Sequence, residues 1–179
     1  MATDKLMIGS KAPDFNLPAV DGITYSLDTF KNMKLLIVAF TCNHCPYVQA
    51  YEDRIKKIQS DYKDQLQIAA INSNEDTNYP EDSFEEMKKR SNLKQFNFPY
   101  LRDETQEIAK AYGSTHTPEI FLFDGNREMV FHGKIDDNWQ DEKNVKSKYL
   151  RNAIEELLAG KPVSIPETFT IGCTIKWRQ

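Results

Sequence analysis

The feature that most constrains the fold is an apolar run, Leu35 to Phe40, that leads directly into two cysteines separated by two residues. Such an uninterrupted run is typical of a strand covered on both faces, and so of a central strand. Pro46 follows the second cysteine, in the first helical turn where its missing N–H costs nothing. Apolar residues then recur at helical spacing. The segment therefore predicts a central strand, a loop from Thr41 to Cys45, and a helix that ends near Tyr62.

The remainder of the chain alternates between strand and helix patterns. A hairpin is expected around Asp21-Gly22, since Asp-Gly between short alternating runs favours a tight turn. The other expected elements are strands at 66–71, 119–123 and 127–131, helices at 81–93, 103–112 and 147–159, and an irregular tail at 161–179. This order predicts an α/β sheet with an antiparallel edge. A length of 179 residues favours one domain, 1–179, with the tail packed on it.

Composition excludes several classes of function. The net charge of -4 argues against non-specific nucleic-acid binding, which needs a basic face. No stretch approaches the roughly 18 apolar residues of a membrane span, and the first ten residues lack the apolar core of a signal peptide. Three cysteines are too few for a disulfide framework. We therefore expect a cytoplasmic protein with no nucleic-acid or membrane partner.

The cysteine pair indicates thiol–disulfide chemistry. A helix N-terminus offers free N–H donors and a partial positive charge, which stabilise a thiolate. Cys42 is then expected to attack a disulfide of a protein or small molecule, and Cys45 to resolve the mixed disulfide. We expect Cys42 to be the more exposed thiol, with a pKa below the free value of about 8.5. A protonated His44 would lower the pKa of Cys42 further.

Metal and haem sites are the main alternatives for these cysteines. Zinc takes about four ligands, which Cys42, His44, Cys45 and a distant Cys173 or histidine could supply, but the sequence has no second compact ligand pair. A c-type haem site needs histidine directly after the second cysteine, where this chain has Pro46. An inert buried pair is the remaining alternative. We predict no metal and no cofactor.

Two further segments carry candidate site residues. Thr117-Pro118 lies directly before an expected strand, where a proline can take the cis form and order a tight turn. The backbone before Pro118 can pair with an extended substrate. Cys173 is the third cysteine, and apolar neighbours in the tail suggest that the tail docks. Isolated cysteines are usually small buried hydrophobes, but a docked Cys173 could serve as a third thiol.

Several segments resemble one family. They are Asn43 to Val48, Gly9 to Phe15, Phe98 to Asp103, Thr117 to Phe123, His132 to Asp137 and Gly172 to Trp177. With them the chain resembles the peroxiredoxin-like members of the redoxin branch of the thioredoxin superfamily, the alkyl hydroperoxide reductase/thiol-specific antioxidant group. The resemblance implies a thioredoxin fold with an N-terminal β-hairpin, an inserted segment after the second core strand and a C-terminal tail. It also implies that Cys42 is the nucleophile, Cys45 the resolving thiol and Pro118 a cis-proline.

The sequence departs from typical members in ways that leave three functions open. Typical peroxiredoxins carry Pro-x-x-x-Thr-x-x-Cys, which neither Cys42 nor Cys45 matches, and thioredoxins carry Trp where this chain has Thr41. The leading hypothesis is a thiol–disulfide oxidoreductase that draws on a thiol electron donor. The alternatives are a thiol-dependent peroxidase acting on hydroperoxides, and a non-enzymatic redox sensor whose tail changes conformation on oxidation.

Overall fold

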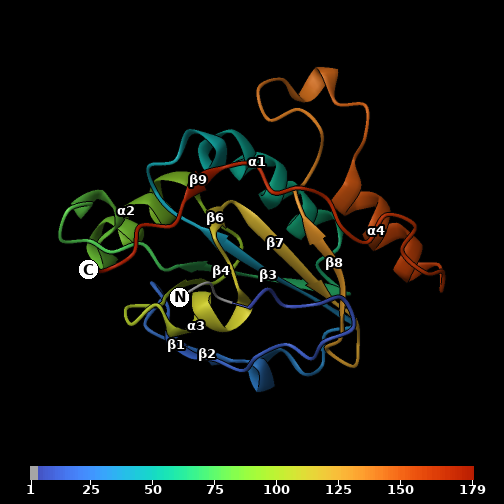
Figure 1. The fold of residues 1–179 in the computed structure, drawn as a ribbon, viewed down its shortest axis with the longest axis horizontal. Coiled ribbons are helices and arrows are strands. Elements are labelled where there is room, and N and C mark those ends of the chain that lie inside the picture. The colour runs from blue at the N-terminus through green and yellow to red at the C-terminus, as the bar shows by residue number, and fades with distance from the viewer. Residues whose placement is uncertain (1–3) are drawn as a thin grey trace.

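A five-stranded mixed sheet lies at the centre of the computed structural model, which describes residues 4–179 (Figure 1). The strand order is β5-β4-β3-β7-β8. β4 runs parallel to β3 and β5, whereas β7 runs antiparallel to β3 and β8. The bounds are β3 Leu35–Thr41, β4 Leu66–Asn72, β5 Tyr100–Arg102, β7 Glu119–Phe123 and β8 Met129–Gly133.

The central strand β3 is buried along its whole length, as its apolar run predicts. Side chains alternate between the two faces of a strand, and each face of β3 packs into a different core. Leu36, Val38 and Phe40 pack with residues of the N-terminal hairpin and α3. Leu35, Ile37 and Ala39 pack with residues of α1 and α4. Burial on both faces therefore explains why β3 shows no polar alternation.

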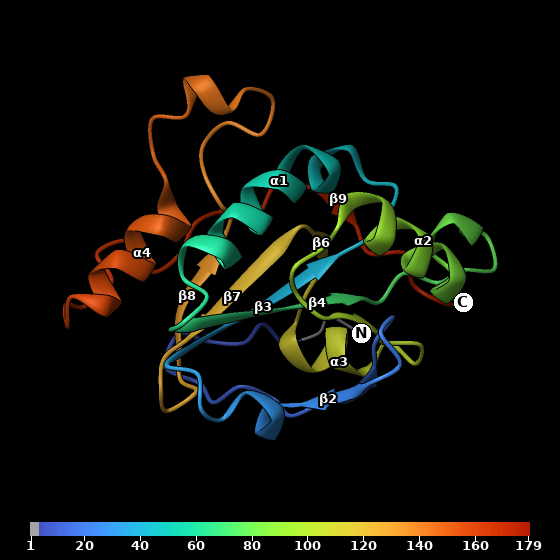
Figure 2. The ribbon, with the colours of Figure 1, turned by 180° about the vertical axis from the view of Figure 1, so that it is seen from behind.

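Helices cover the two faces of the sheet in separate groups (Figure 2). α1 and α4 lie over one face, while α3 and the hairpin of β1 and β2 lie over the other. α2 lies beside the β5 edge, where Met87 packs against Tyr100. The bounds are α1 Pro46–Asp61, α2 Phe84–Lys94, α3 Glu107–Tyr112, α4 Tyr149–Leu158, β1 Asn16–Pro18 and β2 Thr24–Ser26; short 3-10 turns are η1 Leu27–Phe30, η2 Pro80–Asp82 and η3 Glu142–Asn144.

The observed architecture confirms the predicted α/β fold with an N-terminal hairpin, and η2 and α2 form the inserted segment between β4 and β5. Some boundaries differ. β5 was not expected, because three residues carry too little pattern to reveal a strand. α3 begins at Glu107 rather than at Asp103, because the Asp103 carboxylate accepts hydrogen bonds from the backbone N–H groups of Ile108 and Ala109. Asp103 therefore lies before the helix.

The C-terminal tail, expected to be irregular, contains a short strand. β9 (Cys173–Thr174) pairs antiparallel with β6 (His116–Thr117), the strand directly before Pro118. In Figure 1 the tail crosses from α4 past the N-terminal end of α1 and continues toward α2. Within residues 4–179 the helices are all too short or too polar to cross a membrane.

The doubly covered sheet gives a first prediction. Leu122 on β7 is fully buried, whereas Leu93 on α2 is 76% exposed. Leu122→Ala should lower the free energy of unfolding by about 2–5 kcal/mol, because it removes buried methyl groups and leaves a cavity. The same substitution at Leu93 should change it by less than about 0.5 kcal/mol. Urea titration followed by circular dichroism measures both, and equal effects would contradict the assigned core.

Candidate active site

The two cysteines of the predicted pair lie at the end of the central strand. Cys42 directly follows β3, and Cys45 is the N-cap residue of α1, with Pro46 in the first turn as expected. Both are buried: Cys42 is 2% exposed and Cys45 is 0% exposed. The expected difference in exposure between Cys42 and Cys45 is therefore very small, because Thr117, Val48 and the tail residue Cys173 pack around the pair.

The loop between the cysteines is held by the inserted segment. The backbone N–H of Asn43 donates to Asp82 Oδ1 at 2.6 Å, and its side-chain amide donates to the carbonyl of Glu81 at 2.8 Å. Tyr100 donates its hydroxyl to Asn43 Oδ1 at 2.8 Å, and Gln49 donates to the Asn43 carbonyl at 2.9 Å. Every polar group of Asn43 thus has a partner, which fixes the geometry of the loop.

The Thr117–Pro118 turn lies against the cysteine pair, and its peptide bond is cis, which confirms that prediction. Cys42 Sγ is 3.4 Å from Thr117 Oγ1, and the Cys45 thiol, when protonated, can donate to the Thr117 carbonyl at 3.4 Å. Glu119 supports the turn from behind: its carboxylate accepts from Ser114 Oγ at 2.7 Å and lies 2.7 Å from His132 Nε2. A buried carboxylate therefore braces the segment that faces the sulfurs.

The protonation of the pair is the reverse of what the sequence suggests. A hydrogen bond from Cys42 lowers the pKa of Cys45, against burial, and the Cys173 thiol and the Val48 backbone N–H add to the effect. The pKa of Cys42 is raised, first because its proton is held by the Cys45 sulfur, then by burial and by the negative charge of Asp82. The helix N-cap is Cys45, so the helix end stabilises that thiolate rather than the one on Cys42.

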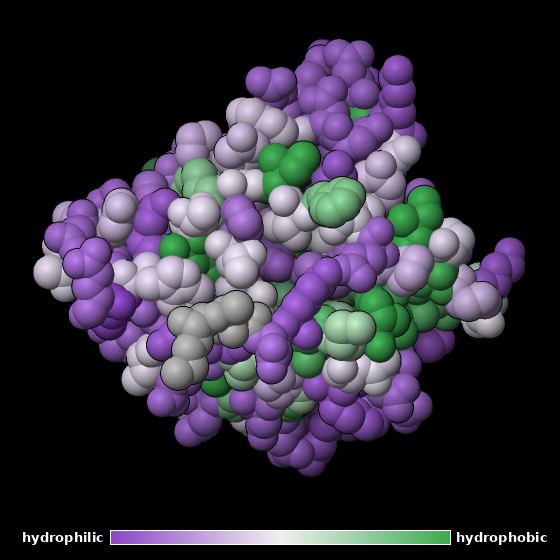
Figure 3. Space-filling view, in the orientation of Figure 1, coloured by the Kyte–Doolittle hydropathy of each residue, from purple (hydrophilic) through white to green (hydrophobic). Residues whose placement is uncertain are grey.

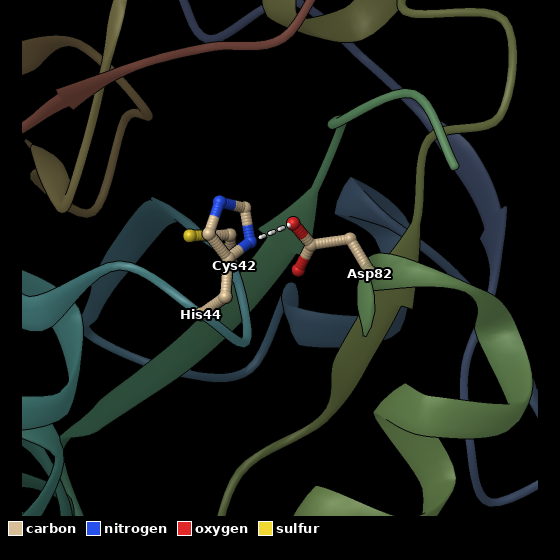
Figure 4. A group of neighbouring side chains, drawn as sticks. All are labelled: Cys42, His44 and Asp82. Carbon is tan, nitrogen blue, oxygen red and sulfur yellow. Dashed lines mark ion pairs between the residues drawn. The ribbon is translucent and has the colours of Figure 1, made fainter. Parts of the chain in front are cut away.

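His44, predicted to tune the thiol, faces a carboxylate that the sequence did not reveal. Its Nδ1 is 2.5 Å from Asp82 Oδ2, and Figure 4 shows the imidazole ring turned toward that carboxylate. The negative charge of Asp82 also opposes a thiolate on Cys42. Asp82 is buried and comes from η2, so no local motif links it to the cysteines.

The same three residues are the group most suited to a metal ion within residues 4–179. The sulfur of Cys42, Nδ1 of His44 and a carboxylate oxygen of Asp82 lie within 4.8 Å of one another. A closed zinc site takes four ligands, and the His44–Asp82 contact already pairs two of these three groups. The three groups are one ligand short of a closed zinc site.

The third cysteine lies beside the pair. Cys173 Sγ is 2.7 Å from Cys45 Sγ, because β9 is paired with β6 at Thr117. All three cysteines are free thiols in this structure. The structure therefore brings together every residue that the sequence singled out, namely Cys42, His44, Cys45, Thr117, Pro118 and Cys173, and it adds Asp82, Tyr100 and Glu119.

The chain resembles known proteins in both sequence and structure. The family model described as Redoxin matches residues 7–149, which include both cysteines and the Thr117–Pro118 turn. The chain belongs to the Redoxin family. The curated proteins gave no match. A hypothetical protein from Sinorhizobium meliloti 1021 is similar in structure, with a TM-score of 0.92 and 38% identity over 98% of this chain and 97% of that one.

Two further solved structures are similar to this Redoxin protein. An uncharacterized conserved protein from Geobacillus kaustophilus has a TM-score of 0.91 and 39% identity, covering 96% of this chain and 93% of that one. The thioredoxin domain of a thiol-disulfide oxidoreductase from Bacteroides vulgatus has a TM-score of 0.62 and 20% identity, covering 72% of this chain and 89% of that one. The last similarity confirms the predicted thioredoxin fold.

The charge of Asp82 gives a prediction about the Redoxin site. Asp82→Asn should lower the pKa of Cys42, because the negative charge that opposes the Cys42 thiolate is removed. Cys42 alkylation, followed by mass spectrometry, should then begin at lower pH than in the wild type. Glu85→Gln removes an exposed carboxylate that pairs with Lys88 and should leave the profile unchanged. A Cys42 profile that Asp82→Asn does not move would contradict this electrostatic assignment.

Proposed function

We propose that the chain is a thiol–disulfide oxidoreductase whose Cys42–Cys45 pair cycles between dithiol and disulfide. The observation that carries the proposal is the packing of Cys42 against Cys45 at the N-terminus of α1, with both sulfurs 3.4 Å from atoms of Thr117. Two cysteines that pack together in this way can form a disulfide without a large movement of the backbone. Membership of the Redoxin family supports the same reaction class.

The proposed cycle begins with Cys42. Its sulfur attacks one sulfur of a substrate disulfide, a Cys42–substrate bond forms, and the departing thiolate takes up the proton that Cys42 loses. Cys45 then attacks Cys42 Sγ as a thiolate. The Cys42–Cys45 disulfide forms and the second half of the substrate leaves as a thiolate. Two electrons have passed to the substrate, and a thiol electron donor restores the dithiol.

The low pKa of Cys45 suits the resolving role. A thiolate is the nucleophilic form of cysteine. Once Cys42 is in the mixed disulfide its proton is gone, and the Cys173 thiol and the Val48 N–H are the donors that stabilise a thiolate on Cys45. Because the pKa of Cys42 is raised, Cys42 must lose its proton during the first attack. We further propose a cytoplasmic setting, supported by three cysteines that are too few for a structural framework.

Single cysteine variants test the cycle. With a fluorogenic disulfide-linked peptide as substrate and dithiothreitol as donor, Cys42→Ser should abolish turnover. Cys45→Ser should instead accumulate a mixed disulfide on Cys42, because the resolving thiolate is gone. Intact mass and non-reducing peptide mapping identify the adduct.

The other outcomes are equally informative. Adducts that accumulate on Cys45 in Cys42→Ser, and not on Cys42 in Cys45→Ser, would reverse the two roles. Undiminished turnover in both variants would remove the mechanism altogether. Consumption of hydroperoxide by the wild type, without disulfide turnover, would replace the proposal with a peroxidase.

A further inference from the structure

The tail lies where an extended substrate is expected. β9 pairs antiparallel with β6, so Cys173 is opposite Thr117, the residue before Pro118. The backbone N–H of Ile175 continues the pairing by donating to the carbonyl of Thr115 at 2.9 Å. An extended substrate that pairs its backbone at this turn, as the sequence predicts, would present its sulfur to the cysteine pair. The tail therefore fills that place with a cysteine of its own.

Gly172 makes the close approach possible. A Cβ added at this position would lie 2.0 Å from the Thr117 carbonyl oxygen and 2.7 Å from its carbonyl carbon. Real Cβ atoms do not come so close to backbone atoms, so any larger residue forces the two strands apart. The requirement for glycine beside Cys173 is thus a requirement of docking against the Thr117–Pro118 turn.

Contacts on the C-terminal side of Cys173 hold the strand in place. Ile175 is buried in the core beneath β3 and β7. The backbone N–H of Lys176 donates to Asn74 Oδ1 at 2.9 Å, and its carbonyl accepts from Gln106 Nε2 at 2.8 Å. Arg178 forms ion pairs with Asp76 and Glu104. The position of the Cys173 sulfur is therefore set by a network and not by the thiol itself.

The segment before Cys173 is held differently. The backbone of β8 pairs with it, as His132 donates to the Pro166 carbonyl at 2.9 Å and Thr168 donates to the His132 carbonyl at 3.0 Å. The apolar side chains Ile165, Phe169 and Ile171 of this segment are exposed to solvent, with Phe169 91% exposed. Figure 3 shows hydrophobic residues gathered on this face over β8 and α4. Backbone hydrogen bonds rather than apolar burial fasten this part of the tail.

The three sulfurs are arranged around Cys45. Its Sγ is 2.7 Å from Cys173 Sγ, and Cys42 packs against Cys45 in the same buried cluster. Thiol–disulfide exchange needs an attacking sulfur, a central sulfur and a leaving sulfur in contact. Cys173, Cys45 and Cys42 supply these three positions within one chain. Cys173 thus touches the atom at which a Cys42–Cys45 disulfide would be opened.

We propose that Cys173 is a third redox thiol that moves the disulfide from Cys42–Cys45 to Cys45–Cys173, with the tail acting as a built-in substrate strand. The inference rests on the proposed function of the pair. Cys173 loses its proton and attacks Cys45 Sγ, the Cys45–Cys42 bond breaks, and Cys42 leaves as a thiolate that takes up a proton. No electrons leave or enter, so the step needs no further reactant.

The product differs from the starting disulfide in two respects. Cys42 is returned to the thiol form while the protein stays oxidised, and the tail becomes covalently fixed across the Thr117–Pro118 turn. An oxidised molecule is then closed to extended peptides. The thiol donor must reduce Cys45–Cys173, whose outer sulfur belongs to the half-buried Cys173.

Mapping of disulfides tests the proposal. The full chain is treated with one equivalent of diamide, a thiol oxidant, then alkylated, digested without reduction and analysed by mass spectrometry. We expect Cys45–Cys173 as the main linked pair, with Cys42 alkylated. Gly172→Ala keeps all three thiols but should lose this pair in favour of Cys42–Cys45, because the tail can no longer dock. Gly125→Ala is the matched control, since its Cβ would meet only the Lys34 carbonyl at 3.5 Å.

The outcomes separate the inference from the proposed function. A wild type that links only Cys42 with Cys45 and leaves Cys173 alkylated would overturn the third-thiol role, as would a Gly172→Ala map identical to that of the wild type. Turnover of the peptide disulfide is measured on the same samples. A Cys45–Cys173 link in a protein without turnover would overturn the proposed function and leave the internal exchange standing.

Discussion

The carbonyl group and side chain of Thr117 are the point at which the site is assembled, since three separate segments meet there. The hydroxyl contacts Cys42, the carbonyl contacts Cys45, and the backbone pairs with Cys173. Thr117 holds this place because β7 continues from it into the centre of the sheet beside β3. Neighbouring strands in a sheet are about 4.8 Å apart, so the end of β3 brings the cysteines within reach. The chemistry depends on this single strand pairing in the core.

Burial determines how charge is distributed over the site. A buried negative charge needs hydrogen-bond partners. The sulfur with the most hydrogen-bond donors around it is therefore the one that loses its proton at the lowest pH. Cys45 has donors in the helix end and in two flanking thiols, whereas Cys42 has the negative charge of Asp82 nearby. Burial raises the pKa of Cys173, and the hydrogen bond to Cys45 and the charge of Cys45 raise it further. These directions favour a thiolate on Cys45 over one on Cys42 or Cys173.

The sequence predicted what is encoded locally. The β3–loop–α1 unit follows from a continuous apolar run, a cysteine pair and Pro46, and the cis-proline follows from Thr117-Pro118 before a strand. Asp82 and Tyr100 were missed because they reach Asn43 from 39 and 57 residues away. The pKa of Cys42 was predicted in the wrong direction for the same reason: a motif shows the helix end, but not which cysteine caps it or which carboxylate lies opposite. The residues Gly172-Cys173-Thr174 also carry no local pattern that predicts a strand, because β9 forms only by pairing with β6.

The tail belongs to the same molecule as β6, the strand with which it pairs. Any other strand that pairs with β6 must therefore compete with a segment of the same chain. Residues 159–172 tether β9 to the end of α4, so its pairing with β6 is an intramolecular event. Short flexible tethers give effective concentrations on the order of millimolar. A separate strand that made only the same contacts would lose to β9 at any lower concentration. A protein partner that pairs with β6 in place of β9 must therefore gain affinity from contacts elsewhere. The exposed Phe169 on the displaced tail offers one such contact.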